Sequence, residues 1–174
     1  MPPRSRGRPS TGSMARESEV MTATVDDLSL LERRRIEAMV LVPVIRAMQA
    51  RFGEVEVNEV VADAIRGIAA EQGGRGPTVE TTDELAIAFG RGGPIQDGSL
   101  TIEVTPAAPN QFGFDVKHCQ FVDMYAELGA SDLGFLLSCN RDAASFAAMA
   151  PDLPFERTQT RMQGATHCDF RFRQ

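Results

Sequence analysis

Two N-terminal segments carry hydrophobic residues at alternating spacings of three and four, which is the period of an amphipathic helix. The first, over residues 29–52, begins with Ser29 and Glu32 spaced as a capping box and stops before Gly53. The second covers residues 57–72. The apolar stripes consist of Ile36, Met39, Val40, Val44, Met48 and Phe52 in the first helix and of Val57, Val60, Val61, Ala64, Ile65 and Ile68 in the second.

Further along, the pattern alternates between helical and extended segments. A short third helix is predicted over residues 82–89, with Thr81 as its cap. Apolar residues then recur at every second position over residues 100–104 and 112–116, which predicts two paired antiparallel strands. Three more short helices follow, over residues 120–129, from Ser131 to the Ser138-Cys139-Asn140 run, and from an N-cap at Asp142 to Met149.

The last segment is typical of a β-hairpin. Residues 155–162 and 166–173 form its arms, with Gln163-Gly164 at the turn, and Cys168 and Phe170 alternate with polar neighbours. Helices, strands, more helices and a hairpin, in this order, favour an α+β fold over a doubly wound parallel sheet. We therefore predict N-terminal helices packed on an antiparallel sheet that ends in a C-terminal hairpin.

Composition and charge indicate one acidic domain. The chain has 174 residues, of which 43% are hydrophobic and 24% charged, and its formal net charge is −6. We expect a single α+β domain over residues 20–174. Residues 1–19 are expected to be a disordered leader or a tail left by cloning, because residues 1–13 are rich in Arg, Pro, Gly and Ser. The three arginines at positions 33–35 spread around a helix and are interpreted as a solvated face.

The same features narrow the location and the partners. Apolar runs are shorter than the roughly 18 residues of a membrane-spanning helix, and the N-terminal arginines precede no apolar core. We therefore expect a cytoplasmic protein with no membrane partner. An acidic body disfavours nucleic acid as a partner. A small-molecule substrate is expected, and the sequence is compatible with a homo-oligomer.

Several catalytic signatures are absent, which leaves a set of thiols. The sequence has no G-x-S-x-G, H-E-x-x-H, C-x-x-C or G-x-G-x-x-G, and Lys117 is its only lysine. Its three cysteines are an odd number without a signal peptide, which favours free thiols or metal ligands over a disulfide framework.

The cysteines fall where predicted elements begin or end, so their side chains can converge on a pocket. They are Cys119, Cys139 and Cys168, and Asp142 follows Cys139 by three residues. One interpretation is a thiolate nucleophile held near an acid or base. Another is a metal ion held by the thiolates with Asp142 or a histidine. A third is that the cysteines are small hydrophobic residues of the core.

Other side chains could bind a substrate. His118 and His167 each adjoin a cysteine, and neighbours on a strand point to opposite faces, so a surface or hydrogen-bonding role is the simpler interpretation for both. His118 is kept as a candidate for substrate binding. Arg157 could clamp a substrate carboxylate through two parallel hydrogen bonds, or could pair with Asp169 on the facing arm.

The segment from Val116 to Arg171 resembles the L-2-amino-thiazoline-4-carboxylic acid hydrolase family. The resemblance lies in V-K-H-C before a helix, in L-G-F-L-L-S-C-N-R-D, and in F-E-R-T-Q-T-R-M-Q-G-A-T-H-C-D-F-R, and with the N-terminal helices it extends over residues 30–173. The matching residues are Cys119, Cys139, Asp142, Arg157, Thr158, Gly164, Cys168, Asp169 and Phe170.

This resemblance implies a hydrolase that opens a C–N bond in a small nitrogen heterocycle, a cyclic amidine or amide bearing a carboxylate. Cys119, Cys139 or Cys168 would supply the nucleophile and Asp142 the base, while Arg157 and Thr158 would bind substrate, with no cofactor required. The last segment also resembles vinyl-reductase-like sensor domains. That resemblance implies the alternative, a non-catalytic small-ligand or metal-binding module that could hold zinc.

Overall fold

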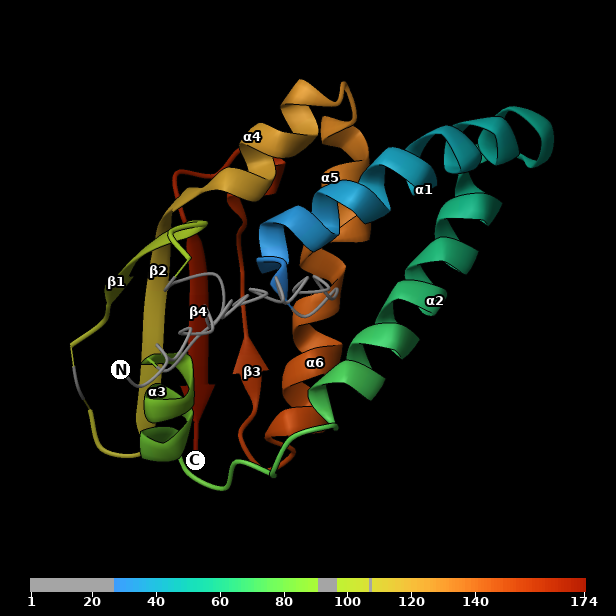
Figure 1. Ribbon diagram of the computed structural model, residues 1–174. Coiled ribbons are helices and arrows are strands. Elements are labelled where there is room, and N and C mark those ends of the chain that lie inside the picture. The colour runs from blue at the N-terminus through green and yellow to red at the C-terminus, as the bar shows by residue number, and fades with distance from the viewer. Residues whose placement is uncertain (1–26, 91–96, 107) are drawn as a thin grey trace, which may run out of the picture.

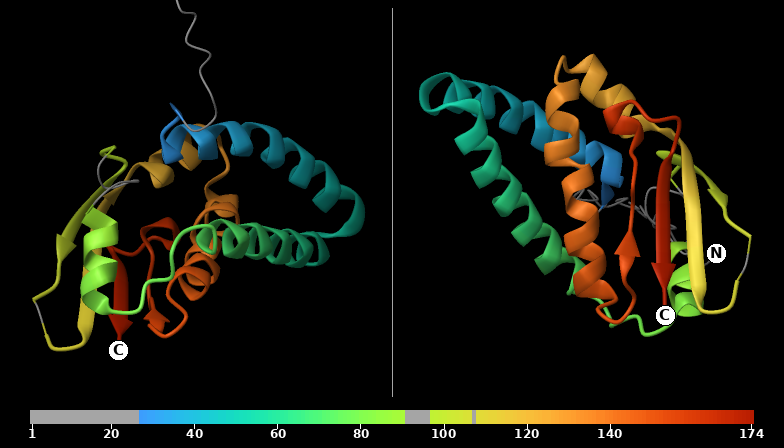
Figure 2. Two further views of the ribbon diagram at one scale, coloured as in Figure 1. Left: turned by 60° about the horizontal axis from the view of Figure 1, so that its bottom comes forward. Right: turned by 180° about the vertical axis from the view of Figure 1, so that it is seen from behind.

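The computed structural model describes residues 27–90, 97–106 and 108–174 (Figure 1). The expected leader over residues 1–19 lies outside them. Within the described part of the chain, α1 (Leu30–Phe52) and α2 (Glu54–Gly73) are joined at Gly53 and form a V that extends away from the sheet (Figures 1 and 2). The chain turns between the two helices at Gly53, whose φ is 97°. Residues with a side chain rarely adopt this backbone conformation, so the turn favours glycine.

The remaining helices are short and alternate with the strands. The expected capping box of Ser29 and Glu32 is present in α1, and Thr81 and Glu84 exchange backbone and side-chain hydrogen bonds at the start of α3. The helices are α3 (Thr82–Gly90), α4 (Gln120–Glu127), α5 (Ser131–Leu137) and α6 (Asp142–Met149), with the 3-10 turns η3 (Cys139–Arg141) and η4 (Arg161–Gln163).

The sheet has four antiparallel strands in the order β1-β2-β4-β3. These are β1 (Leu100–Val104), β2 (Gln111–Cys119), β3 (Phe155–Glu156) and β4 (Cys168–Arg173). Helix α6 packs beside β3, and α2 packs along α6, so the helical part extends from the β3 edge of the sheet (Figure 1). The predicted α+β class and the antiparallel sheet with a C-terminal hairpin are confirmed.

One arm of the hairpin is much shorter than predicted. Only Phe155 and Glu156 pair with β4, opposite Phe172 and Arg171. The next backbone amides leave the ladder because the Asp169 carboxylate accepts them: its Oδ1 lies 3.0 Å from the amide nitrogen of Thr158 and 2.8 Å from that of Gln159. A side chain therefore replaces the strand partner, and the prediction of an arm over residues 155–162 is wrong.

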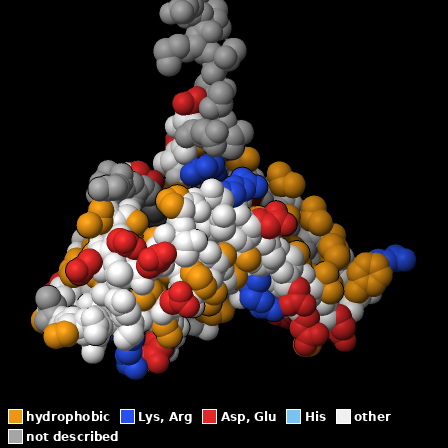
Figure 3. Space-filling model, turned by 90° about the horizontal axis from the view of Figure 1, so that it is seen from below, with side chains coloured by type: hydrophobic (Ala, Val, Ile, Leu, Met, Phe, Trp, Pro, Cys, Tyr) orange, Lys and Arg blue, Asp and Glu red, His pale blue; other side chains and the backbone are white. Residues whose placement is uncertain are grey.

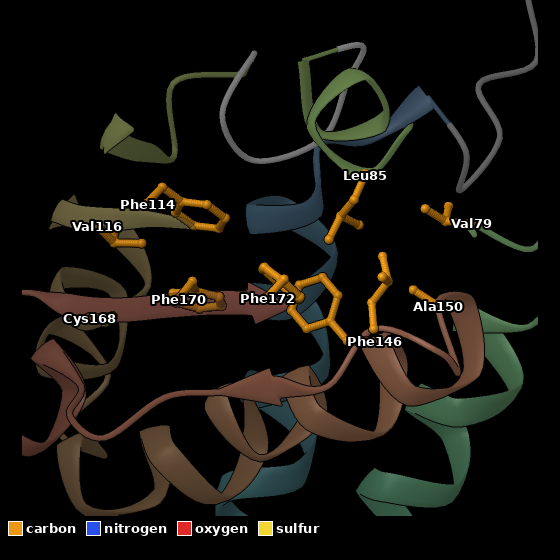
Figure 4. Packing of buried hydrophobic residues seen from close by; sticks show 10 residues of the cluster. Val79, Leu85, Phe114, Val116, Phe146, Ala150, Cys168, Phe170 and Phe172 are labelled. Carbon is orange, nitrogen blue, oxygen red and sulfur yellow. The ribbon is translucent and has the colours of Figure 1, made fainter. Parts of the chain in front are cut away.

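Two hydrophobic clusters form the core. The one at the sheet is rich in phenylalanine, and Figure 4 shows Phe114, Phe170, Phe172 and Phe146 pointing toward one another. The Phe114 and Phe170 rings stack with centroids 4.7 Å apart, and Phe146 meets Phe172 edge-on at 4.9 Å. The other cluster lies among the helices and contains Ala38, Ile45, Val57, Ile65, Met124, Tyr125, Ala130, Leu133 and Leu137.

The stripe predicted for the first helix is not its buried face. Ile36, Met39, Val40, Val44 and Phe52 are all exposed, whereas α1 buries Arg34, Ala38 and Ile45. Met48 is the member of the predicted stripe that contacts the helical cluster. The other contacts of α1 come from a second row at the same spacing, which includes Leu41 beside Ala38 and Ile45. Figure 3 shows exposed hydrophobic side chains along the arm where α1 and α2 run. Within the described residues, the helices lack the combined length and apolar character of a membrane span.

Candidate active site

A cavity lies between the sheet and the helices. Its volume is about 190 Å³, below the ~300–1,000 Å³ typical of pockets for drug-sized ligands, so it suits a small molecule. Helix α2 can approach α6 here because Gly73 has no side chain: an added Cβ would lie 2.3 Å from the carbonyl oxygen of Ser145. The lining consists of Leu30, Arg34, Ala69, Gln72, Leu100, Val116, Cys119, Phe121, Ser138, Cys139, Arg141, Asp142, Ser145, Arg157, Cys168 and Phe170.

The three cysteines all line this cavity, and all are free thiols. Cys119 is the last residue of β2 and the N-cap of α4, while Cys168 opens β4 opposite Val116 of β2. Neighbouring strands thus place these two cysteines at one end of the sheet. Cys139 reaches the cavity from the 3-10 turn between α5 and α6. The three cysteines, which lie at separate element boundaries in the sequence, therefore line one cavity, as predicted.

Asp142 and Arg157 form an ion pair in the cavity wall. Nη1 of Arg157 donates to Oδ2 of Asp142, and Nη2 donates to the backbone carbonyl of Cys139 at 3.1 Å. The guanidinium also lies 5.5 Å from the centroid of the Phe170 ring. The predicted N-cap role of Asp142 is wrong, because Arg141 occupies the N-cap position and Asp142 is itself the first residue of α6. The predicted alternative pairing of Arg157 with Asp169 is also wrong.

The apolar wall shifts the acidity of the groups that could react. Burial raises the pKa of Asp142 to about 6, although the neighbouring Arg157 acts in the opposite direction. Asp142 is therefore largely ionised at neutral pH. Burial also raises the pKa of each cysteine, and for Cys139 the charge of Asp142 adds to the effect. The three thiols are consequently protonated before a ligand binds.

Cys119 differs from the other two thiols in its surroundings. The backbone amides of Val122 and Phe121, in the first turn of α4, oppose the effect of burial and lower the Cys119 pKa. Cys168 accepts a hydrogen bond from the backbone amide of Arg161, with the nitrogen 3.2 Å from Sγ, but its side chain is more buried. Cys119 thus combines partial exposure with a helix N-terminus that stabilises a thiolate.

Two arginines that the sequence pattern did not single out also reach the cavity. Arg34 and Arg141 are buried, and both line it. They share the Glu37 carboxylate: Nη1 of Arg34 lies 2.7 Å from Oε1, and Nη2 of Arg141 lies 3.0 Å from Oε2. The interpretation of residues 33–35 as a solvated face is therefore wrong for Arg34. Arg34 shares a row at helical spacing with Ala38 and Ile45, but the sequence does not decide that this row turns inward.

The other proposed substrate contacts lie outside the cavity lining. His118 is exposed and lies 3.4 Å from Asp123, measured from Nε2 to Oδ2. Thr158 is exposed and donates its hydroxyl to Asp169 at 2.6 Å. His167 contacts the Gln159 side-chain amide, which lies 2.9 Å from its Nε2. Each histidine thus faces away from the cavity that its neighbouring cysteine lines, as the alternation along a strand predicts.

A metal site was one of the predicted alternatives for these thiols. In the described ranges 27–90, 97–106 and 108–174, His, Cys, Asp and Glu side chains do not gather in groups of three or more that could hold a metal ion. The three thiols line the cavity without forming such a group.

The fold and the site together define an α+β protein with a small cavity lined by thiols, arginines and one aspartate. Residues 33–172 match the L-2-amino-thiazoline-4-carboxylic acid hydrolase family, and the chain belongs to that family. The family name describes a hydrolase, which agrees with the coarse activity inferred from the sequence motifs. A comparison with curated proteins gives no significant match.

Proposed function

We propose that the protein is a hydrolase that opens a C–N bond in a small nitrogen heterocycle, a cyclic amidine or amide carrying a carboxylate. The observation that carries the proposal is the meeting of three thiols and an arginine-held carboxylate in one small cavity. Membership of a family named for hydrolysis of such a ring supports it.

Cys119 is the proposed nucleophile. It lies in the cavity wall at the N-terminus of α4, where the helix dipole and the first-turn amides oppose part of the rise in pKa that burial causes. Cys139 is the least suited of the three, since burial and the nearby Asp142 charge both oppose its ionisation. We assign Cys139 and Cys168 to the shape of the cavity.

Asp142 is the proposed proton carrier, and Arg157 positions it. In the first half of the reaction, the Cys119 sulfur bonds to the ring carbon, the ring C–N bond breaks, and the thiol proton passes through Asp142 to the leaving nitrogen. In the second half, water attacks the same carbon, its proton passes to Asp142, and the C–S bond breaks to restore the thiol. One water molecule is added across the C–N bond in total.

Arg157 holds the carboxylate of Asp142 in a fixed orientation during both halves. Two of its donors are already engaged, by Asp142 and by the Cys139 carbonyl. We therefore assign it to positioning Asp142 rather than to clamping the substrate.

The test is a ring-opening assay against cyclic amidines, hydantoins and lactams with and without a carboxylate. Turnover of at least one carboxylated ring is expected, and Cys119→Ser should reduce it by about 100-fold or more, because a hydroxyl is a far weaker nucleophile than a thiolate. Cys139→Ser is the matched control and should retain activity within about tenfold. Binding of these rings without turnover would contradict the proposal and favour a ligand-binding module, and equal losses in both variants would remove Cys119 as the nucleophile.

A further inference from the structure

The cavity contains an uncompensated positive charge on its helical side. Arg34 and Arg141 share the single carboxylate of Glu37, so this group of three side chains has a formal charge of +1. Arg157 and Asp142 balance each other. The chain as a whole is acidic, with a formal net charge of −6, so the surplus inside the cavity is a local feature.

Arg141 has a hydrogen-bond donor without a partner. Its side chain is 8% exposed; Nε donates to the Leu137 carbonyl at 2.8 Å and Nη2 to Glu37. Its Nη1 is buried and has no hydrogen-bond partner within the described residues. A buried guanidinium nitrogen without an acceptor costs free energy, and a polar ligand group in the cavity that Arg141 lines would relieve that cost.

Nearby charges support an anionic ligand here. Burial, and after it the proximity of Arg34, lowers the Arg141 pKa, although Glu37, Tyr125 and Asp142 act in the opposite direction. Two further unpartnered nitrogens, Nε of Arg33 and Nε of Arg161, belong to side chains that do not line the cavity. The combination of burial, a free donor and cavity lining is therefore found at Arg141 among these three arginines.

We infer that Arg141, with Arg34 beside it, binds the carboxylate of the substrate and selects for carboxylated rings. The guanidinium fork offers Nη1 to one carboxylate oxygen while Glu37 and Leu137 hold the rest of the side chain in place. Bound there, a small ring would extend toward Asp142 and Cys119, which line the same cavity. This inference rests on the proposed function for the identity of the ring.

The test compares an acid with its neutral amide. L-2-amino-thiazoline-4-carboxylate and the corresponding 4-carboxamide are assayed with the parent protein, Arg141→Met, Arg141→Lys and Arg35→Met. Arg35 is a matched control because it lies one residue after Arg34 and forms an exposed ion pair with Glu127. For the acid, Arg141→Met should lower kcat/KM by roughly 10- to 100-fold, as expected for a lost hydrogen bond to a charged group. The amide should be affected less than threefold, Arg141→Lys should recover part of the selectivity, and Arg35→Met should match the parent.

Equal losses for the acid and the amide would overturn the inference, because they would indicate a structural role for Arg141. Calorimetric binding of both compounds separates this outcome from a failure of the proposed function. One outcome is that the parent opens neither ring yet still binds the acid more tightly than the amide, with Arg141→Met abolishing that preference. In that case the inference that Arg141 binds a carboxylate is supported, and the proposed hydrolase activity is wrong. If the parent shows no preference for the acid in binding or turnover, the inference is wrong.

Discussion

The sheet half and the helical half of the molecule each contain a hydrophobic cluster, but the helical half also buries arginines. At the sheet, hydrophobic side chains that alternate along β2 and β4 are the buried ones, and their phenylalanine rings contact one another across the core (Figure 4). In α1, Arg34 is buried while Ile36, Met39 and Val40 are exposed. The first half is built as a conventional core, and the second brings charge into the interior.

This contrast explains where the candidate site lies. The sheet half supplies two of the thiols and an apolar wall, and the helical half supplies Arg34, Arg141 and Asp142. Charged groups interact more strongly beside an apolar wall than in water, because less solvent screens them. The boundary between the two halves is therefore a suitable place for proton transfer and for binding an anion.

The largest expected effect comes from replacing a phenylalanine by alanine, once in the sheet half and once in the helical half, which compares how tightly the two halves are packed. Phe172→Ala should lower the free energy of unfolding by about 3–5 kcal/mol, because the ring is 1% exposed and its loss leaves a cavity. Phe52→Ala, at the tip of the α1–α2 V, should change it by less than about 0.5 kcal/mol, since that ring is 60% exposed. Urea denaturation measures both, and similar losses would show that the V tip is covered in solution.

A smaller effect concerns the charged side of the boundary. Arg157→Met removes the cation that lowers the Asp142 pKa, so that pKa should rise above about 6. A larger fraction of Asp142 is then protonated at a given pH. For a rise of about one pKa unit, the ring-opening rate should fall about twofold at pH 7 and about tenfold at about pH 5, which lies below both pKa values. The acid limb of the pH–rate profile should move to higher pH. Arg157→Lys keeps the charge and should leave the limb near its original position; a limb that does not move in Arg157→Met would contradict the assigned pairing.

The smallest effect tests which row of α1 is buried. Ile45→Val should cost about 0.5–1.5 kcal/mol of unfolding free energy, because Ile45 is 1% exposed in the helical cluster. Val40→Ala should cost less than about 0.5 kcal/mol, because Val40 is 62% exposed. Thermal or urea unfolding of the two variants gives the comparison, and a reversed order would mean that the predicted stripe is the buried one after all.

The same contrast shows how far the sequence could predict this structure. Strand alternation around Phe114 and Phe170, the capping box at Ser29 and the stop at Gly53 each depend on neighbouring residues, so the fold class and most element boundaries were predictable. The shortened hairpin arm was not, because it depends on a contact of Asp169 with Thr158 and Gln159 that period-two alternation does not encode.

The candidate site was predictable in part for a related reason. Cysteines at element boundaries indicated convergence, and Asp142 followed Cys139 closely enough to join them. The role of Arg34 was hidden because α1 has two apolar rows at the same spacing, and only tertiary packing decides which of them turns inward. The role of Arg141, in η3, depends on its tertiary contact with Glu37 of α1. The partner of Arg157 likewise depends on how α6 packs beside β3.

The most direct test of the central claim, that Asp142 carries protons during ring opening in this cavity, is the pH dependence of kcat/KM. A carboxyl group is ionised above its pKa, so the rate should be level above about pH 6 and fall tenfold per pH unit below it, with an apparent pKa of about 6. In Asp142→Asn the rate at pH 7 should be about 100-fold lower and this limb should be absent. Melting curves would verify that the variant is folded at the assay temperature. An unchanged limb and rate in Asp142→Asn would contradict the account.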